Sequence, residues 1–555
     1  MKEEKRKFAL YLGAATATRQ TILSASFLTK IEEGEAEKLV PHNAGDAEYD
    51  AYFMVSKAKT PRWMQILSGV FNMPQFKKGS PASVVIFEEA GRIFAVTFGY
   101  GSKLLNEYQV EGDFGIKVAI NAVADTALKA VQKSNVASAI QQFAQSAFKA
   151  RFGSFGGQNK FEILKRVSGA VAADDDLNSV VGAAGLSLTT KLNFADIKQI
   201  ASKALTFYAS DAYKKTAFSV VDEFKPVLAL AEVERLDALL LQSVQSQQSN
   251  FEICLPQLNV EDSGYVKIYG SGLKGDFPDV SLDLYKTSFD NLGDITLADL
   301  KDDSVCLYND EHVNVGNWSV YKCLIGGLDD ADGTRYVLND AHWYIPSEAI
   351  VQLVEKYFDD RKAPSDPKLA TFEVTEWEKE VGKKGKTKAV PVYEREETYN
   401  ERIANDAGYV LFDQIWHVAD DGTFQKLEVC DLYDPEGLRM IHVKRTSRQP
   451  SMLSYLFEQG QRAADLWQRD DVRAQFIARV RAEAGDAAAD KLAAVALEPG
   501  ALIIEFAIAD HENAQGHHTI PFLGKLSFEN KARDVELRGF KSQVRFITLE
   551  KPHAI

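Results

Sequence analysis

The last third of the chain has the clearest alternation of hydrophobic and polar positions. Apolar residues that recur every three or four positions predict helices, and β-branched or aromatic runs predict strands. In chain order the pattern predicts a helix at residues 398–405, strands at 409–418, 424–432 and 440–445, a helix at 451–484, a buried strand at 501–509, a helix at 528–537 and a strand at 544–549. A helix, three strands, a helix and a returning strand thus follow one another.

The first two thirds mix strands with helices. Residues 83–87 and 92–98 are β-branched and aromatic runs joined by a short polar turn, which predicts a hairpin. From about 115 to 247 the apolar spacing indicates helices, most clearly at 123–148 and 228–244. Strand-like runs return after 250, and residues 361–390 have the composition of a linker. The predicted class is mixed α/β (α+β) and multidomain, with an N-terminal α+β domain at 1–250 whose second half is helical, a strand-rich domain at 251–370 and an α/β domain at 371–555.

Length and composition agree with several domains in one globular protein. At about 150 residues per domain, 555 residues correspond to three or four domains. The 64 basic and 79 acidic residues give a net charge of −15, which excludes a uniformly basic protein that wraps nucleic acid. Any nucleic-acid site must therefore be local. We expect a cytoplasmic protein with no membrane contact, because no segment has the length and apolarity of a membrane span or of a secretory signal.

A run of lysines in the linker is one candidate for such a local site. It consists of Lys383, Lys384, Lys386 and Lys388, and Arg445 and Arg448 add charge further along the chain. Basic side chains in a flexible loop can hold a phosphate backbone, although a lysine run can also be merely solvated. The run is therefore a predicted nucleic-acid-binding segment.

The C-terminal order of elements resembles the αβββαβ core of the PD-(D/E)xK class of nucleases. Hydrolysis of a phosphodiester in such a site needs a divalent cation held by carboxylates, and a lysine that orients water or offsets charge on the phosphate. The chain has candidates for these roles at the expected places, namely Asp413, Glu428, Asp431 and Lys444, with His442 beside the lysine. We expect Mg²⁺ or Mn²⁺ as the cofactor.

The chain departs from that nuclease pattern at one position. Where the class has Asp or Glu two residues before the lysine, this chain has His442, Val443 and Lys444 in succession. Period two puts His442 and Lys444 on one face of the strand, and Ile441 and Val443 on the other. The strand is therefore predicted to have one polar face and one packed face.

Two arrangements of the metal ligands remain open. In the first, Asp431 lies across a hairpin from the lysine strand and Glu401 is contributed by the preceding helix. In the second, Asp413 and Glu428 bind the metal, and Lys444 reaches in from the next strand. A third interpretation is a surface hairpin whose acids and Lys444 form exposed ion pairs, which are worth at most about 1 kcal/mol each.

Several blocks along the chain resemble a sporadically distributed bacterial family of unknown function, whose members have about 500 or more residues. They include Leu427-Glu-Val-Cys-Asp-Leu, Ile441-His-Val-Lys-Arg, Leu453-Ser-Tyr-Leu-Phe-Glu-Gln-Gly, Phe94-Ala-Val-Thr-Phe-Gly-Tyr-Gly, Asp113-Phe-Gly-Ile-Lys-Val-Ala-Ile-Asn, Tyr336-Val-Leu-Asn, Trp343-Tyr and Ile520-Pro-Phe-Leu-Gly-Lys-Leu-Ser-Phe. The resemblance covers nearly the whole chain. Since such proteins are often encoded near mobile or restriction-type genes, it implies a role in defence against foreign DNA.

Three functional hypotheses follow. The first is a metal-dependent nuclease that acts on foreign nucleic acid, with DNA as the expected substrate. The second is a catalytically inactive, nuclease-like protein that binds or senses nucleic acid or a phage component, with His442 and Cys430 marking a decayed site. A third hypothesis is an oligomeric scaffold, since the predicted helical region 115–247 could serve self-association, and a homo-oligomer is possible for the other two as well.

Overall fold

The computed structural model describes residues 6–550 apart from 41–47, 56–80, 137–140, 156–160, 172–178, 191–193, 247–248, 256–264, 271, 274, 278–279, 309–313, 331, 382–386, 414–416, 419–423, 426–428, 446–449 and 511–517. The chain forms two compact units. The first comprises Met1–Val136 and Ile140–Leu236, and the second comprises Asp237–Ile555 with Ala137–Ala139. The boundary falls inside helix α5 (Leu230–Val244).

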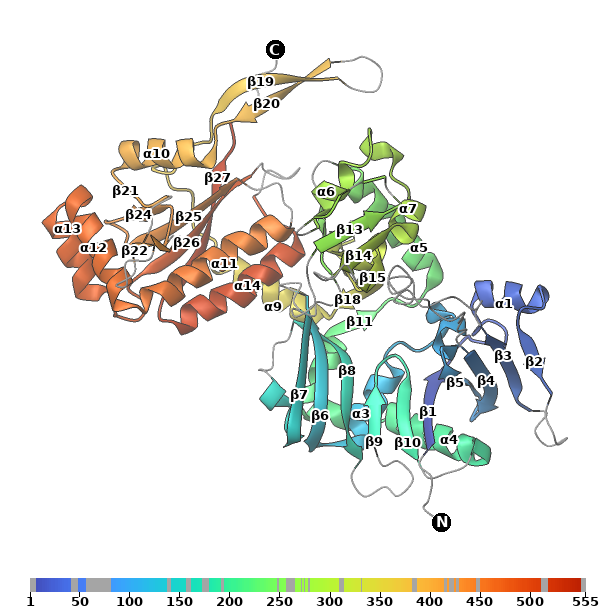
Figure 1. Cartoon of the computed structure of the whole chain (residues 1–555). Coiled ribbons are helices and arrows are strands. Elements are labelled where there is room, and N and C mark those ends of the chain that lie inside the picture. The colour runs from blue at the N-terminus through green and yellow to red at the C-terminus, as the bar shows by residue number, and fades with distance from the viewer. Residues whose placement is uncertain are drawn as a thin grey trace, which may run out of the picture. The chain divides into compact units, whose positions relative to one another are not determined.

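The first unit is built on a ten-stranded antiparallel sheet (Figure 1). Its strand order is β2-β3-β4-β5-β1-β10-β9-β8-β6-β7. The strands are β1 (Arg6–Leu12), β2 (Glu37–Leu39), β3 (Asp50–Val55), β4 (Pro81–Glu89), β5 (Arg92–Gly99), β6 (Val123–Asn135), β7 (Gln141–Ala150), β8 (Glu162–Val171), β9 (Ser179–Gly182) and β10 (Leu186–Thr190), and the α-helices are α1 (Ala25–Glu32), α3 (Phe114–Ala122) and α4 (Ile197–Tyr208). The hairpin predicted at 83–98 is confirmed as β4 and β5.

The block that starts at Asp113 forms helix α3, which packs closely on the sheet. A Cβ atom on Gly115 would lie 2.1 Å from the carbonyl oxygen of Gly185, so only glycine allows this approach. At the other end of α3, Asn121 donates its amide to the carbonyl oxygens of Phe207 and Ser210, each at 2.9 Å, and accepts a bond from the backbone N–H of Tyr213. The block is therefore explained by packing and hydrogen bonding.

The prediction of helix at 123–148 is wrong. Strand β6 lies between β7 and β8, and strand β7 follows it in the same sheet. The segment is rich in alanine and glutamine, which favour helices, but intrinsic propensity is a weak preference that tertiary pairing overrides. The second half of the predicted N-terminal domain is thus a mixture of strands and helices, and the helix predicted at 228–244 is confirmed as α5.

The middle part of the second unit contains two small antiparallel sheets. In one, β16 (Leu324–Asp329) pairs with β12 (Phe251–Ile253) and β17 (Arg335–Asn339), which in turn pairs with β18 (His342–Pro346). The other has the order β13-β14-β15, with β13 (Tyr265–Tyr269), β14 (Ser304–Tyr308) and β15 (Asn314–Ser319). The helices here are α6 (Leu282–Lys286), α7 (Leu297–Asp302), α8 (Val320–Cys323) and α9 (Glu348–Asp359).

The C-terminal part of this unit is a five-stranded mixed sheet with the order β21-β24-β25-β26-β27. Strands β21, β24 and β25 form an antiparallel meander, and β25, β26 and β27 run parallel. The elements are β19 (Val374–Val381), β20 (Thr387–Tyr393), α10 (Glu396–Ala407), β21 (Val410–Leu411), β22 (His417–Val418), β23 (Phe424–Gln425), β24 (Leu432–Asp434), β25 (Arg439–Arg445), α11 (Pro450–Trp467), α12 (Asp470–Ala484), α13 (Asp486–Val495), β26 (Ile503–Asp510), α14 (Phe522–Leu537) and β27 (Lys541–Thr548).

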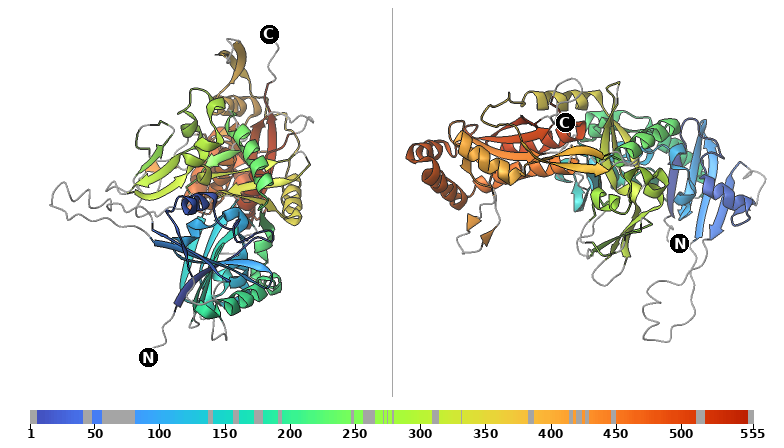
Figure 2. Two further views of the ribbon diagram at one scale, coloured as in Figure 1. Left: turned by 90° about the vertical axis from the view of Figure 1, so that its right-hand side faces the viewer. Right: turned by 90° about the horizontal axis from the view of Figure 1, so that it is seen from above.

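Both faces of this sheet are covered (Figures 1 and 2). Tyr399 and Ile403 of α10 pack with Ile441 and Val443 on one face. Helices α11, α12, α13 and α14 contribute to the larger core that includes Phe506 on the other face. The elements α10, β21, β24, β25, α11 and β26 follow the predicted order. The prediction of one strand at 424–432 is wrong, because β23 pairs with β22 in a separate two-stranded sheet and residues 429–431 are outside strands. The helix expected at 451–484 is divided into α11 and α12, and α13 was not predicted.

The predicted domain boundary near residue 370 remains a prediction, but the segment before it packs on the C-terminal sheet. Tyr357 and Phe358 of α9 belong to the same core as Phe528 of α14. The chain that follows α9 runs along β27, where the N–H of Ala363 donates to the carbonyl oxygen of Val544 at 2.7 Å.

Candidate functional site

Three of the predicted site residues lie at the same end of the C-terminal sheet. Asp413 follows β21, Asp431 precedes β24, and Lys444 is near the end of β25. Because β24 runs opposite to its two neighbours, the end of β21, the start of β24 and the end of β25 meet at one edge. The backbone N–H groups of Phe412 and Asp413 both donate to the carbonyl oxygen of Asp431, at 2.8 and 3.0 Å.

Asp431 connects the two central strands of the meander. Its side chain is buried, and Oδ2 accepts a hydrogen bond from the backbone N–H of Val443 at 2.6 Å. The backbone N–H of Asp431 donates to the carbonyl oxygen of Ile441 at 3.0 Å. The residue thus holds β24 and β25 in register at the end where Lys444 lies.

Lys444 is paired with Glu396, which is not among the predicted site residues. Its Nζ lies 2.7 Å from Oε2 of Glu396, and Oε1 of Glu396 accepts a bond from the backbone N–H of Arg445 at 2.9 Å. Glu396 occupies the first turn of α10, where the helix dipole favours an acidic side chain. The available signal was the pair of acids, Glu396 and Glu397, immediately before the predicted helix.

Asn400 lies one turn further along α10 and faces the same end of the sheet. It is 2% exposed, and its Nδ2 donates to Oδ2 of Asp413 at 3.0 Å, whereas Oδ1 has no hydrogen-bond partner in the described structure. Residues four apart share one side of a helix, so α10 directs Glu396 and Asn400 to the sheet edge together. The next residue, Glu401, is exposed.

His442 does not lie on an open polar face, so that prediction for the strand is wrong. Its side chain is 1% exposed, and its ring stacks with that of Phe506 at a centroid distance of 6.1 Å. Phe506 in turn contacts Phe457 of α11 and Phe528 of α14, so the helical layer covers this face of the sheet. Burial lowers the pKa of His442 from 6.5 to about 4, and the imidazole is neutral at pH 7.

The remaining predicted residues are placed only in part. Glu428, Lys383, Lys384, Lys386 and Arg448 lie outside the described residues. Lys388 belongs to β20, which pairs with β19. Arg445 is exposed at the end of β25, and its guanidinium lies 5.7 Å from the ring centroid of Tyr393, the last residue of β20. Arg445 and β20 are therefore neighbours.

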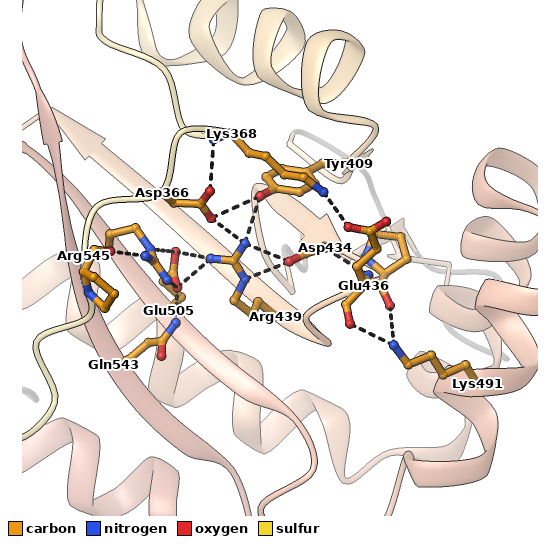
Figure 3. A network of polar contacts seen from close by, with 12 residues as sticks. Asp366, Lys368, Tyr409, Asp434, Glu436, Arg439, Lys491, Glu505, Gln543 and Arg545 are labelled. Carbon is orange, nitrogen blue, oxygen red and sulfur yellow. Dashed lines mark hydrogen bonds and ion pairs between the residues drawn. The ribbon is translucent and has the colours of Figure 1, made fainter.

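A second polar cluster occupies the opposite end of β25 (Figure 3). Arg439 binds Asp434, Asp366 and Glu505, with N···O distances of 2.8, 2.7 and 3.1 Å. Glu505, which is fully buried, also accepts bonds from Arg545 at 2.8 and 2.9 Å and from the amide of Gln543. Burial opposes the charge of Arg439, but Glu505 and Asp366 raise its pKa above the usual value.

Metal-binding groups of three or more His, Cys, Asp or Glu side chains are not found among the described residues, from which Glu428 is missing. In the same part of the chain, no helix has the length and apolarity needed to cross a membrane.

The chain is a multidomain protein of mixed α/β fold, and its C-terminal sheet is an antiparallel meander extended by two parallel strands. The chain belongs to the family of unknown function DUF6119, whose model matches residues 8–548. Neither a curated protein nor a solved structure was found to match it.

Proposed function

We propose that the C-terminal part of the chain is a divalent-metal-dependent nuclease that cuts foreign nucleic acid, with DNA as the substrate, in bacterial antiviral defence. The observation that supports it is the meeting of Asp413, Asp431 and Lys444 at one edge of the sheet β21-β24-β25-β26-β27, whose meander strands β21, β24 and β25 follow α10 and precede α11. Two acids and a lysine at one edge are the groups that phosphodiester hydrolysis requires.

The donor chemistry of this edge suits Mg²⁺ or Mn²⁺, because both ions prefer carboxylate and carbonyl oxygen ligands. When bound, such a cation supplies Lewis-acid polarisation of the phosphate. Asp413 and Asp431 are the residues that would hold it. Lys444 would offset charge on the phosphate, and to do so it must exchange its ion pair with Glu396 for a substrate oxygen.

Basic residues near Lys444 would bind the nucleic-acid backbone. Arg445 is exposed directly after Lys444, and it neighbours the strand that carries Lys388. Phosphate contacts of this kind position a substrate without reading its sequence. We propose a cytoplasmic location, and self-association through 115–247 would use a region that contains both strands and the helices α4 and α5.

The second candidate is a nuclease-like protein that binds nucleic acid or a phage component without cutting it. The observation that favours it is His442, which stands where the nuclease class has an acid and is buried against Phe506. In this candidate Lys444, Arg445 and the lysine run bind the ligand, and no metal is needed.

Purified protein incubated with supercoiled, linear and single-stranded DNA and with RNA, each with and without Mg²⁺ or Mn²⁺, separates the two. The nuclease predicts cleavage that requires the metal and is lost in Asp413→Asn. If the wild type cuts no substrate with either metal, but shifts nucleic acid in a gel without added metal, the nuclease is rejected and the second candidate, the binding protein, is favoured.

A further inference from the structure

The amide oxygen of Asn400 is a buried acceptor that nothing in the described structure satisfies. The side chain is 2% exposed, and the atom Oδ1 has no hydrogen-bond partner. Buried polar groups in native proteins are nearly always paired with protein, water or an ion, so each exception needs an explanation.

The orientation of this amide follows from its neighbour. Nδ2 donates to Oδ2 of Asp413 at 3.0 Å. A rotated amide would bring its oxygen against the carboxylate oxygen of Asp413, where two acceptors repel each other. The oxygen is therefore the end of Asn400 that is left over beside Asp413.

A carboxylate oxygen lies beside this amide, because Oδ2 of Asp413 accepts the bond from Nδ2 of Asn400. The backbone of Asp413 is bonded to the carbonyl oxygen of Asp431 at 3.0 Å, which brings the two aspartates together at the sheet edge. A carboxylate and an asparagine carbonyl are typical protein ligands of Mg²⁺ and Mn²⁺, and Mg²⁺ completes its shell with water and substrate oxygens. A site with few protein ligands is thus sufficient.

We propose that Asn400 is a further metal ligand, whose Oδ1 joins the carboxylate of Asp413 in binding a divalent cation at the edge where Asp431 also lies. The hydrogen bond from Nδ2 then orients the carboxylate toward the ion, as outer-sphere donors do in metal sites. Glu401, the ligand that the sequence predicted from this helix, is exposed and has no part in the site. The proposal deepens the proposed nuclease by naming its ligands, and it rests on that function only for the biological use of the ion.

The test is a calorimetric titration of the full-length protein with Mn²⁺ alone, together with the shift in melting temperature that Mn²⁺ produces. Asn400→Ala should weaken Mn²⁺ binding at least about tenfold and abolish most of the shift. Asn121→Ala is the matched control, because Asn121 is also a helical asparagine, but both ends of its amide are hydrogen-bonded within the first unit. That variant should bind Mn²⁺ as the wild type does.

Asn400→Asp distinguishes a ligand from a residue that only positions Asp413. Aspartate keeps an oxygen ligand, so Asn400→Asp should bind Mn²⁺ at least as tightly as the wild type. Because aspartate cannot donate a hydrogen bond to Asp413, the metal-free variant should melt at a lower temperature than the metal-free wild type. The proposal is overturned if the wild type does not bind Mn²⁺, or if Asn400→Ala binds Mn²⁺ as tightly as the wild type. It is also overturned if Asn400→Asp binds Mn²⁺ as weakly as Asn400→Ala. Mn²⁺ binding of the expected pattern without nucleic-acid cleavage would overturn the nuclease alone.

Discussion

The two ends of strand β25 carry polar clusters of opposite character. At the beginning of the strand, Arg439 and Glu505 are buried in a network in which charged groups bind one another at several points. At its end, Lys444 has a single partly exposed partner, and Asn400 has a buried oxygen with none among the described residues.

The contrast separates a structural role from a functional one. A buried network whose donors and acceptors are all used rigidifies the fold and has no capacity left for a ligand. A cluster with an unused acceptor and an exchangeable ion pair retains that capacity. The Arg439 cluster has more charges, yet the sparser cluster at Lys444 is the better candidate for chemistry.

The largest expected effect is the loss of Glu505. Glu505→Ala removes the shared acceptor of Arg439 and Arg545 and leaves both guanidinium groups buried without it. Breaking a buried ion pair by removing one partner costs about 3–5 kcal/mol, so the free energy of unfolding should fall by that amount. Urea denaturation measures it. A loss below about 1 kcal/mol would mean that the network contributes little to the fold.

The next largest effect is expected on the cleavage rate and not on stability. Lys444→Ala should lower the rate of nucleic-acid cleavage by about 100-fold, the effect of losing one electrostatic stabiliser, and leave the melting temperature nearly unchanged. The matched control is Lys356→Ala, since Lys356 pairs with Asp360 on the surface of α9 and should be neutral in both assays. Cleavage by Lys444→Ala at the wild-type rate would remove the lysine from the mechanism.

A smaller effect should appear as a pH dependence of stability. The folded-state pKa of His442 is about 4, below the unfolded value of 6.5. Between these values the unfolded chain binds a proton that the folded chain does not, so stability is lost as the pH falls through this window. From about pH 7.5 to pH 5 the loss is about 2 kcal/mol. Urea denaturation at pH 7.5 and pH 5 should show a smaller pH-dependent loss of unfolding free energy for His442→Leu than for the wild type. If the two proteins lose the same amount, the imidazole is not buried and neutral in the folded state.

The smallest effect is expected at the rim of the Arg439 cluster. Lys368 pairs with Glu436 at 2.6 Å, but both side chains are exposed, so the pair is weakened by solvent. Lys368→Ala should leave the melting temperature unchanged within error. A clear destabilisation would show that the cluster extends to its solvent-exposed edge.

The order of elements in the C-terminal part was predictable, because its strands and helices have strong periodic patterns. The strand expected at 440–445 is β25, and the turn at 435–438 joins β24 to β25, whereas the strand expected at 424–432 was not found as one strand. Burial of His442 was not predictable, since alternation assigns a face to a residue but does not tell whether another layer covers that face. A related limit explains the wrong helix prediction at 123–148, because the sequence does not tell that other strands pair with this segment.

The candidate site was predictable only as residue types. Asp413, Asp431 and Lys444 were named from the strand pattern, but their partners depend on where α10 docks. For Glu396 the signal was the acid pair that it forms with Glu397 just before the predicted helix, whereas Asn400 is one of many polar helix residues and had no signal of its own. Long-range partners are harder still, since Asp366 and Arg439 are 73 residues apart.

The position of β27 determines when this sheet can be completed during synthesis. Glu505 and Arg439 leave the ribosome before Gln543 and Arg545, which bind the same carboxylate from the last strand. The segment after α9 also waits for β27, its partner in backbone hydrogen bonds. Since chains fold as they emerge, from the N-terminus onward, the first unit has time to form while the C-terminal sheet is still open. A nascent or prematurely terminated chain therefore lacks a closed sheet, and with it a finished site at Lys444.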